Sequence, residues 1–265
     1  MPELRDFAGS VAIVVSSCDA FFDVWRPFTF FFRKFWNDCP FQAFLIVNQL
    51  RVRSRVLTPI AVEADRGWAS NLGVALQQID RTYVLYMQED YFLMGPVQRE
   101  QLAADLAYVL EHDADSLCFR ARSDLDPGFE QINERFGIVP RNSDGRTRCQ
   151  ITLWKREALT SILREGENAW EMESRGSDRT QEMLVLSYSR RENSPVPYLM
   201  SAITRGLWTA EAIAMCREDG IDISPQFRAE YSANSVLRRF RRALTRRRLQ
   251  RELSLRKNRA IDLDP

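Results

Sequence analysis

The sequence predicts an α/β fold in which a parallel sheet is covered by helices. Two observations support this fold class. Short runs of β-branched and apolar residues recur along the first half of the chain, and segments with helical apolar spacing lie between them. Strands that alternate with helices are typical of a parallel sheet, because each helix carries the chain back to the edge where the previous strand began. The 265 residues, 45% of them hydrophobic, are enough to bury the core of one large domain.

The first half of the chain contains the clearest predicted elements. We expect buried strands at residues 11–15, 44–47, 56–62, 83–87 and 116–119. We expect helices at residues 21–36, at residues 68–79 and from Pro96 to residue 110. Because proline is tolerated in the first turn of a helix, Pro27 is expected near the start of the first of these helices.

The second half is less regular. Residues 122–144 are rich in Gly, Pro, Asp, Asn and Arg, which predicts a long functional or mobile loop. Strands are expected at residues 148–154, 183–188 and 198–204, and helices at residues 155–164 and 208–218. Gly220 would end the last helix. Residues 169–179 between these elements are polar and are expected to be irregular.

The histidine and cysteine counts exclude several kinds of site. His112 is the only histidine, and the five cysteines are dispersed without a CxxC pair, which argues against a structural zinc site. An odd number of separated cysteines indicates reduced thiols in a cytoplasmic protein. Because His112 ends a helical pattern, a surface position is expected for it, and a Ser-His-Asp or Cys-His mechanism is not favoured.

No targeting or membrane-spanning segment is expected. Residues 1–10 contain two acids and lack the basic start of a secretory signal. The longest run without a charged residue, residues 67–79, includes Asn and Gln and is shorter than the roughly 20 apolar residues that span a bilayer.

Residues 83–93, Tyr-Val-Leu-Tyr-Met-Gln-Glu-Asp-Tyr-Phe-Leu, contain the most informative candidate site. A hydrophobic strand ends there in the adjacent carboxylates Glu89 and Asp90. Ligands of open parallel sheets bind beyond the C-terminal strand ends, and carboxylates at that place suit a Mg²⁺ ion that bridges a diphosphate. The alternative is that the two acids only begin a solvated turn.

Six short motifs occur in a fixed order along residues 11–228. They are Ser16-Ser-Cys-Asp19, Phe35-Trp36, Gln88-Glu-Asp-Tyr-Phe92, Ile151-Thr-Leu-Trp-Lys-Arg-Glu157, Trp170-Glu-Met-Glu173 and Gly206-Leu-Trp208. As an ordered set they resemble the GT-A-fold glycosyltransferases of bacterial surface-polysaccharide and lipopolysaccharide loci. The resemblance implies a Rossmann-like, mostly parallel sheet flanked by helices. It implies a domain at residues 1–235, with a nucleotide-sugar-binding half at about 1–121 and an acceptor half at about 122–235.

The resemblance also implies donor-side residues. Asp19 would accept hydrogen bonds from the base or ribose, with a helix N-cap as the alternative. Trp68 would pack against the nucleotide or the acceptor, with core packing as the alternative. Asp90, and after it Glu89, would bind the donor diphosphate through Mg²⁺ or Mn²⁺. Gln88 and Glu89 depart from the Asp-x-Asp or Asp-Asp pattern of the family, which leaves a metal-independent reaction open. Arg228 would contact a phosphate.

On the acceptor side, the resemblance implies Glu173 as the general base of an inverting transfer, with Glu171 in reserve. The alternative is that both acids complement the dipole of a helix N-terminus. Tyr91, Trp154 and Trp170 would contact the acceptor, whereas core packing is the alternative for Tyr91 and Trp154.

The end of the chain is strongly basic. Residues 237–259 contain eleven Arg or Lys and one Glu, so that residues 236–265 carry +8 and the remainder −7 within a net charge of +1. Leu237, Phe240 and Leu244 share one helical face, and Leu249 and Leu253 form a second apolar patch. A basic amphipathic helix of this kind suits an anionic membrane surface. Nucleic-acid binding and a solvated terminal helix are the alternatives.

Together these features predict a cytoplasmic glycosyltransferase that is peripheral on the inner face of the cytoplasmic membrane. Its partners would be a nucleotide-diphosphate sugar, a lipid-linked glycan acceptor and, through residues 237–259, the membrane, with no nucleic acid. A non-catalytic membrane-associated scaffold is one alternative, supported by the altered pair Gln88 and Glu89. A sugar-phosphate nucleotidyltransferase is the other, although residues 11–21 lack the glycines of a phosphate-binding loop.

Overall fold

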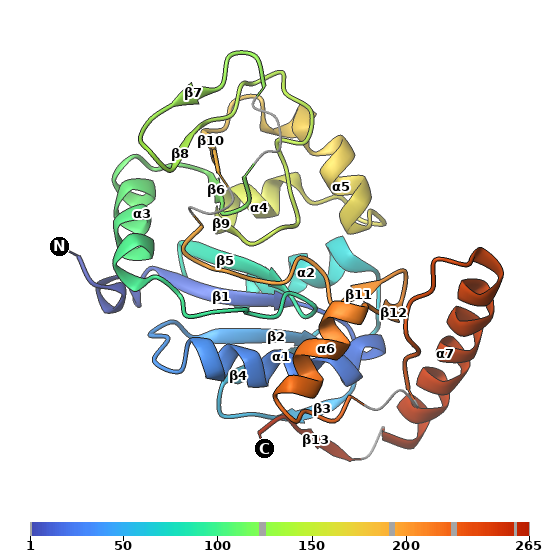
Figure 1. Cartoon of the computed structure of the whole chain (residues 1–265). Helices are drawn as coiled ribbons and strands as arrows, with labels where there is room; N and C mark the ends of the chain where they lie inside the picture. The colour runs from blue at the N-terminus through green and yellow to red at the C-terminus, as the bar shows by residue number, and fades with distance from the viewer. Residues whose placement is uncertain (1, 122–125, 191–193, 224–226, 257–258, 265) are drawn as a thin grey trace.

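The computed structural model describes residues 2–121, 126–190, 194–223, 227–256 and 259–264. Its centre is a nine-stranded sheet with the strand order β4-β2-β1-β5-β9-β6-β10-β8-β7 (Figure 1). The strands are β1 (Val11–Ser16), β2 (Ala43–Val47), β4 (Leu57–Ala61), β5 (Tyr83–Gln88), β6 (Ser116–Cys118), β7 (Glu130–Gln131), β8 (Phe136–Ile138), β9 (Thr152–Lys155) and β10 (Val185–Tyr188). The predicted α/β class, with a central sheet flanked by helices, is confirmed.

The sheet is mostly parallel but not entirely so. Strands β4, β2, β1 and β5 are parallel, and β6 is parallel to β10. In contrast, β9 runs antiparallel between β5 and β6, and β8 is antiparallel to β10. The first half of the chain therefore builds the uniform parallel part of the sheet, and the second half contributes the reversed strands.

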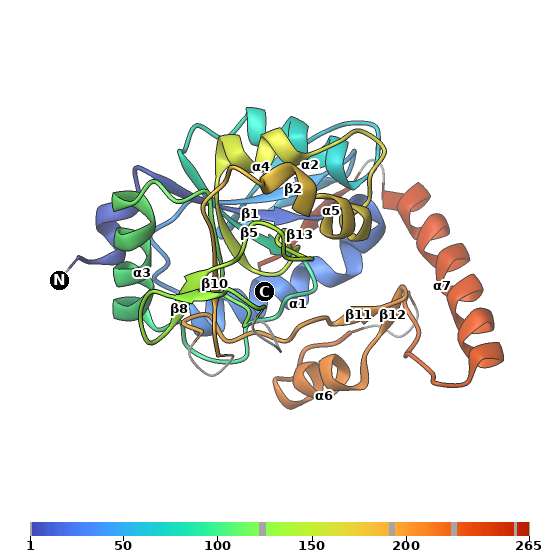
Figure 2. The ribbon, with the colours of Figure 1, turned by 90° about the horizontal axis from the view of Figure 1, so that it is seen from above.

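Helices cover both faces of the sheet. Helices α1 (Phe22–Phe35) and α3 (Arg99–Glu111) pack on one face, and α2 (Trp68–Gln77) and α4 (Arg156–Ile162) pack on the other (Figure 2). Successive side chains of a strand point to opposite faces, and alternate residues of β1 accordingly belong to the two different cores. All six residues of β1 are buried for this reason, which explains the unbroken apolar run in the sequence.

Two helices differ from the prediction at their N-terminal ends. Pro27 is the sixth residue of α1 and so lies beyond the first turn, where it was expected. Helix α3 begins at Arg99 rather than at Pro96. Backbone hydrogen bonds explain this later start, because the Val97 N–H donates to the Phe35 carbonyl (3.4 Å) and the Gln98 N–H to the Pro195 carbonyl (2.9 Å).

The predicted loop and the predicted irregular segment both contain regular structure. Residues 122–125 of the loop lie outside the described residues, and β7 and β8 form a hairpin in the rest of it. Residues 169–179 are helical rather than irregular, since α5 (Ala169–Arg175) is followed by the 3₁₀ helix η3 (Ser177–Thr180). The Asn168 side chain caps α5, a local signal that composition alone does not reveal.

The strand expected at residues 198–204 is shorter than predicted. Only β11 (Ile203–Thr204) is a strand, and it pairs with β12 (Leu207–Trp208) across a tight turn. Arg205 and Gly206 form this turn with φ of +52° and +80°, the combination that two-residue hairpins favour. Because β12 includes Trp208, α6 (Ala210–Glu218) begins two residues later than predicted.

The basic C-terminal segment forms the long helix α7 (Ser235–Arg256), at the right of Figure 1. It packs against the rest of the protein through Leu249, which is 7% exposed, and Leu253. The Ala229 N–H also donates to the Thr245 hydroxyl of this helix (3.1 Å). After it, β13 (Ala260–Asp262) pairs with β3 (Arg51–Arg53). The patch of Leu249 and Leu253 is therefore part of the core rather than a second exposed face.

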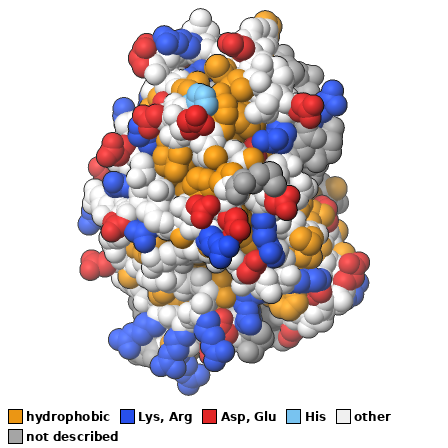
Figure 3. Space-filling model, turned by 90° about the vertical axis from the view of Figure 1, so that its left-hand side faces the viewer, with side chains coloured by type: hydrophobic (Ala, Val, Ile, Leu, Met, Phe, Trp, Pro, Cys, Tyr) orange, Lys and Arg blue, Asp and Glu red, His pale blue; other side chains and the backbone are white. Residues whose placement is uncertain are grey.

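The surface position expected for His112 is confirmed. His112 follows α3 directly and stacks on Tyr108, with 3.9 Å between the ring centroids (Figure 3). Among the described helices, none combines the length and apolar composition required to cross a bilayer.

Candidate active site

The candidate site lies where β1 and β5 end side by side. The two strands pair in parallel register from Val11 with Tyr83 to Ser16 with Gln88. The segments that follow, residues 17–19 and 89–90, therefore leave the sheet at the same edge. This is the C-terminal edge at which open parallel sheets bind their ligands.

Glu89 and Asp90 are both buried at this edge. They are 6% and 7% exposed. Asp90 Oδ2 accepts hydrogen bonds from the Ser201 hydroxyl (2.7 Å) and the Ile203 N–H (3.3 Å). Asp90 Oδ1 is also buried, but none of the described residues donates a hydrogen bond to it. A buried oxygen of this kind is costly unless a proton, a cation or a ligand satisfies it.

Burial changes the protonation of both acids. It raises the pKa of Asp90 to about 6, against the opposing effect of the hydrogen bonds from Ser201 and Ile203. The pKa of Glu89 is raised well above its usual value, mainly by burial and then by the negative charge of Asp90. Two adjacent carboxylates with raised pKa values have a strong tendency to bind a proton or a cation.

The two acids fit a cation that phosphate oxygens complete. Within the described part of the chain, no group of three or more His, Cys, Asp or Glu side chains is arranged to hold a metal ion. Mg²⁺, however, commonly uses only one or two carboxylates together with substrate phosphates and water. The partnerless Oδ1 of Asp90 and the neighbouring Glu89 supply such a pair.

The carboxylate of Asp19 is hydrogen-bonded within the protein. It accepts three backbone N–H groups, from Asn48 (2.8 Å), Gln49 (2.8 Å) and Leu50 (2.9 Å). It thereby fixes the turn after β2 next to the end of β1. The alternative role as an N-cap is not observed either, since Phe21 precedes α1. What the structure assigns to Asp19 is the shape of the site edge.

The guanidinium of Arg228, a predicted phosphate contact, is paired within the protein. It is 2% exposed and forms a two-pronged ion pair with Asp23 (3.0 and 2.9 Å). Two further N–H groups donate to the carbonyls of Ala20 and Gly206 (2.9 and 3.0 Å). Four of the five N–H groups of the guanidinium are thus used within the protein, and a phosphate contact by Arg228 stays a prediction. The positive charge still acts at the site, where it lowers the pKa values of Glu89 and Asp90 against the effect of burial.

Glu173 is linked to the end of β5 through the backbone of one residue, Cys149. The Cys149 N–H donates to Glu173 Oε1 (2.7 Å). The Cys149 carbonyl in turn accepts hydrogen bonds from the Tyr91 hydroxyl (2.6 Å) and from the Gln88 amide (3.5 Å). Cys149 thus links the predicted base to the two residues that flank Glu89 and Asp90.

Glu171 has the structural role that was considered as its alternative. Its Oε2 accepts the Asn168 N–H (2.9 Å), while the Asn168 side chain accepts the N–H groups of Trp170 and Glu171. This is a reciprocal capping box at the start of α5. The carboxylate of Glu171 thus stabilises the helix terminus, and its use as a reserve base stays a prediction.

The aromatic residues that were predicted to contact ligands differ in how deeply they are buried. Trp154 is 1% and Tyr91 4% exposed, so both pack in the core, which is the alternative that was considered for them. The indole N–H of the half-buried Trp68 donates to the Tyr86 hydroxyl (3.0 Å), which attaches that ring to β5. Trp170 is 82% exposed on α5, the helix that carries Glu173. Trp170 alone of the three predicted acceptor contacts presents its ring to solvent.

Two side chains at the site were not predicted from the sequence. Ser201 donates to Asp90 although 111 residues separate them, and no local pattern indicates such a contact. Cys18, between Ser17 and Asp19, has its pKa raised to about 12 by burial and then by the charge of Glu89, so it remains a neutral thiol. In the sequence, only the position of Cys18 within the Ser16-Ser-Cys-Asp19 motif indicates that it lies at the site.

Comparisons with known proteins give structural similarities only. No protein-family model matches the chain, and no curated protein matches its sequence. Residues 1–349 of Staphylococcus aureus TarS superpose with a TM-score of 0.45 and 16% identity, over 71% of this chain and 59% of that one. A mannosyltransferase, PcManGT from Pyrobaculum calidifontis, was solved in complex with GDP-Man and Mn²⁺. It superposes with a TM-score of 0.33 and 15% identity, over 46% of this chain and 38% of that one.

A mycobacterial protein superposes with a TM-score of 0.42 and 10% identity, over 88% of this chain and 82% of that one. The chain spans 59% of the shorter TarS structure and 36% of the longer one. All of these superpositions have TM-scores below 0.5, so the chemistry of the site has to be inferred from the residues of this chain.

Proposed function

We propose that this protein is a glycosyltransferase with a GT-A-type fold. It transfers a sugar from a nucleotide-diphosphate sugar to a hydroxyl group of a lipid-linked surface glycan, with inversion, at the inner face of the cytoplasmic membrane. The observation that carries the proposal is the pair of buried carboxylates at the end of β5, one of which has an oxygen without a partner.

The donor would bind at the C-terminal edge of β1 and β5. Residues 17–19, the turn that Asp19 fixes and the start of α2 at Trp68 surround this edge. Glu89 and Asp90 would hold a Mg²⁺ or Mn²⁺ ion against the diphosphate, and such an ion would stabilise the charge of the leaving group. A donor bound in this way places its anomeric carbon toward the end of β5.

Glu173 would take the proton of the acceptor hydroxyl. Its Oε1 is held by the Cys149 N–H, and no described residue donates a hydrogen bond to Oε2. As Oε2 accepts the proton, the acceptor oxygen bonds to the anomeric carbon. The bond from that carbon to the phosphate oxygen breaks on the opposite face, and the nucleoside diphosphate leaves with the electron pair. Trp170, exposed on the same helix, offers a ring on which the acceptor sugar packs.

Helix α7 would attach the enzyme to the membrane. Val236, Leu237 and Phe240 are 75%, 40% and 65% exposed near its start. Exposed arginines surround them, namely Arg239, Arg242, Arg246 and Arg247. Apolar side chains next to arginines suit an anionic bilayer surface. Because Leu249 and Leu253 pack on the body, the contact would use the first half of the helix.

The proposal is tested by calorimetric titration with a panel of UDP-, GDP- and CMP-linked sugars, with and without Mn²⁺. We expect one donor to bind, more tightly with Mn²⁺, and to be turned over when a glycan acceptor is added. A nucleotidyltransferase would instead require a nucleoside triphosphate and a sugar phosphate. Absence of binding by the whole panel would contradict the proposal and favour the scaffold alternative.

A further inference from the structure

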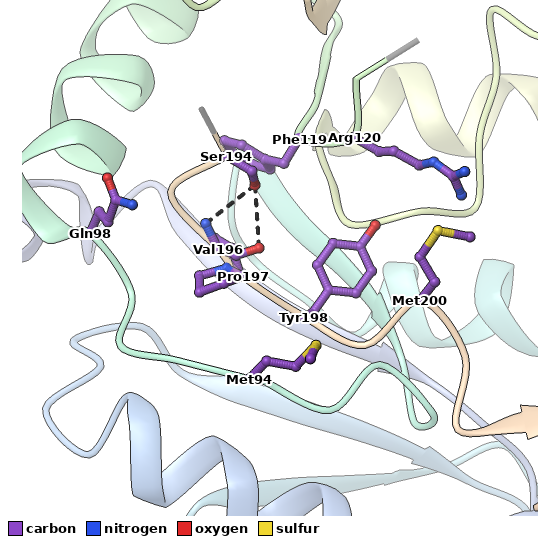
Figure 4. A pocket seen from close by; sticks show the side chains of 9 residues that line it. All are labelled: Met94, Gln98, Phe119, Arg120, Ser194, Val196, Pro197, Tyr198 and Met200. Carbon is purple, nitrogen blue, oxygen red and sulfur yellow. Dashed lines mark hydrogen bonds between the residues drawn. The ribbon is translucent and has the colours of Figure 1, made fainter. Parts of the chain in front are cut away.

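A cavity lies beside residues 194–200, the segment that leads to Ser201 and so to Asp90. Its volume is about 470 Å³. Nine of the described residues line it, namely Met94, Gln98, Phe119, Arg120, Ser194, Val196, Pro197, Tyr198 and Met200 (Figure 4). None of these residues belongs to the donor site described above.

One wall of this cavity is continuous with the candidate active site. The Leu199 N–H donates to the Phe92 carbonyl (2.8 Å) and the Met94 N–H to the Pro197 carbonyl (3.0 Å). The segment at residues 194–200 is therefore bonded to the chain that leaves Asp90. It continues directly into Ser201, whose hydroxyl donates to Asp90. A molecule in this cavity would lie beside the residues that orient the Asp90 carboxylate.

The same wall also leads toward the predicted base. The Tyr198 ring packs against Tyr91, with 5.2 Å between centroids, and its hydroxyl donates to Gln150 Oε1 (2.8 Å). Gln150 follows Cys149, whose N–H binds Glu173. The cavity is thus within a few residues of both the donor carboxylates and Glu173, which is where an acceptor has to bind.

The described lining is mostly apolar, with Gln98 and Ser194 as uncharged polar side chains and Arg120 as the charged one. Phe119, Pro197, Tyr198 and the two methionines give mostly apolar surface, while Arg120 contributes a half-buried guanidinium (Figure 4). Within the described part of the chain, no carboxylate forms an ion pair or hydrogen bond with Arg120. A partly desolvated guanidinium that has no counter-ion among the described residues is better placed to bind an anion than an exposed arginine. The cavity therefore combines a surface for a sugar ring with a site for one negative charge.

We propose that this cavity binds an acidic saccharide unit of the acceptor, a sugar that bears a carboxylate or a phosphate. The sugar ring lies against Tyr198 and the methionines, and the anionic group pairs with Arg120. A neutral sugar leaves the guanidinium without a partner and binds more weakly. The assignment of this ligand as the acceptor rests on the proposed glycosyltransferase function, whereas binding of the acidic saccharide does not.

The test uses three probes that share one aromatic group: 4-methylumbelliferyl β-D-glucuronide, the corresponding β-D-glucoside and 4-methylumbelliferyl phosphate. Their affinities are measured by ligand-observed NMR for the wild-type protein and for Arg120→Gln. We expect the glucuronide or the phosphate to bind at least about tenfold more tightly than the glucoside, and Arg120→Gln to abolish this preference. The tighter of the two anions identifies which acidic group the cavity takes.

Two further variants make the result specific to the cavity. Arg26→Gln removes an exposed arginine of α1 and should leave all three affinities unchanged. Met200→Glu places a carboxylate in the cavity and should weaken only the anionic probes, which tests the proposal even if Arg120→Gln does not fold. Equal binding of the glucuronide, the phosphate and the glucoside, or an equal loss in Arg26→Gln, would overturn the proposal. UDP-sugar binding is measured on the same samples. Because it tests the proposed donor site and not this cavity, a failure of the proposed function can be told apart from a failure of the cavity proposal.

Discussion

Two buried aspartates in this protein have opposite surroundings. Asp105 is 0% exposed and both of its oxygens are satisfied, because Oδ1 accepts two N–H groups of Arg135 (2.9 and 2.6 Å) and Oδ2 accepts the Tyr188 hydroxyl. Asp90 is almost as buried, yet its Oδ1 has no partner among the described residues. Burial alone therefore does not identify a functional carboxylate. Asp105 is held by its partners within the fold, whereas the unsatisfied oxygen of Asp90 is the observation on which the proposed donor site rests.

The largest expected effect is on transfer by Asp90→Asn. The amide preserves the shape of the side chain but cannot carry the charge that binds a cation and the diphosphate. We expect a loss of about a thousandfold in kcat/KM, about 4 kcal/mol, with an unchanged circular dichroism spectrum. Turnover within tenfold of wild type would remove Asp90 from the site.

The matching change at the satisfied aspartate should affect stability instead. Arg135→Gln leaves the buried Asp105 without its charged partner, which is expected to cost about 3 kcal/mol in the free energy of unfolding. Urea denaturation measures this loss. Donor binding should stay at the wild-type level once the variant is folded, and a selective loss of donor binding would contradict the comparison.

The contrast also predicts a pH dependence of stability. Burial raises the pKa of Asp90 to about 6 in the folded state, from a usual value of 3.8. Between these values the folded protein binds more protons than the unfolded chain. The free energy of unfolding should therefore fall as the pH rises from about 4 to about 6, by on the order of 3 kcal/mol.

Urea titrations at pH 4, 5, 6 and 7 without metal ions check this prediction. In Asp90→Asn the fall should be reduced, because the group that titrates is absent. An equally steep fall in that variant would assign the effect to other carboxyl groups.

Two glutamates on α5 provide a second test of the same distinction. Glu173→Gln should lower kcat about a hundredfold, about 2.7 kcal/mol, and leave the Kd for the donor unchanged, because the base acts on the acceptor. Glu171→Gln removes only the capping charge and should change kcat less than twofold. Equal effects of the two substitutions would show that Glu173 also acts through the helix.

The smallest expected effect concerns α7. Arg247→Gln should weaken binding to vesicles that contain phosphatidylserine by about 1 kcal/mol, roughly fivefold, because it removes one exposed charge. Sedimentation with vesicles measures the change, and vesicles of phosphatidylcholine alone serve as the control. Equal binding of the wild-type protein to both kinds of vesicle would exclude the electrostatic attachment.

The sequence predicted those features that depend on neighbouring residues. The buried strands β1, β2 and β5 are visible as apolar runs, and the position of Asp90 at the end of β5 follows from the strand pattern. The contacts of the site depend instead on distant segments. The approach of Ser201 to Asp90 and the pairing of Arg228 with Asp23 arise from tertiary packing that no local spacing encodes.

The same limit applies to residues for which the sequence left two roles open. Trp154 is an aromatic residue at the end of a strand, and only the burial of β9 between β5 and β6 shows that it belongs to the core. Glu171 and Glu173 are two residues apart and look equivalent in the sequence. The structure distinguishes them, because Glu171 forms the capping box with Asn168 and Glu173 does not.

The pairing of β13 with β3 has a mechanical consequence for α7. The helix is bonded to residues 229–233 near its start, and the chain beyond it is fastened to β3, where the Leu263 N–H donates to the Arg53 carbonyl (3.0 Å). Contacts at both ends of this segment hold α7 in a fixed orientation relative to the rest of the protein. Any surface that binds α7 would therefore also set the orientation of the central sheet relative to that surface.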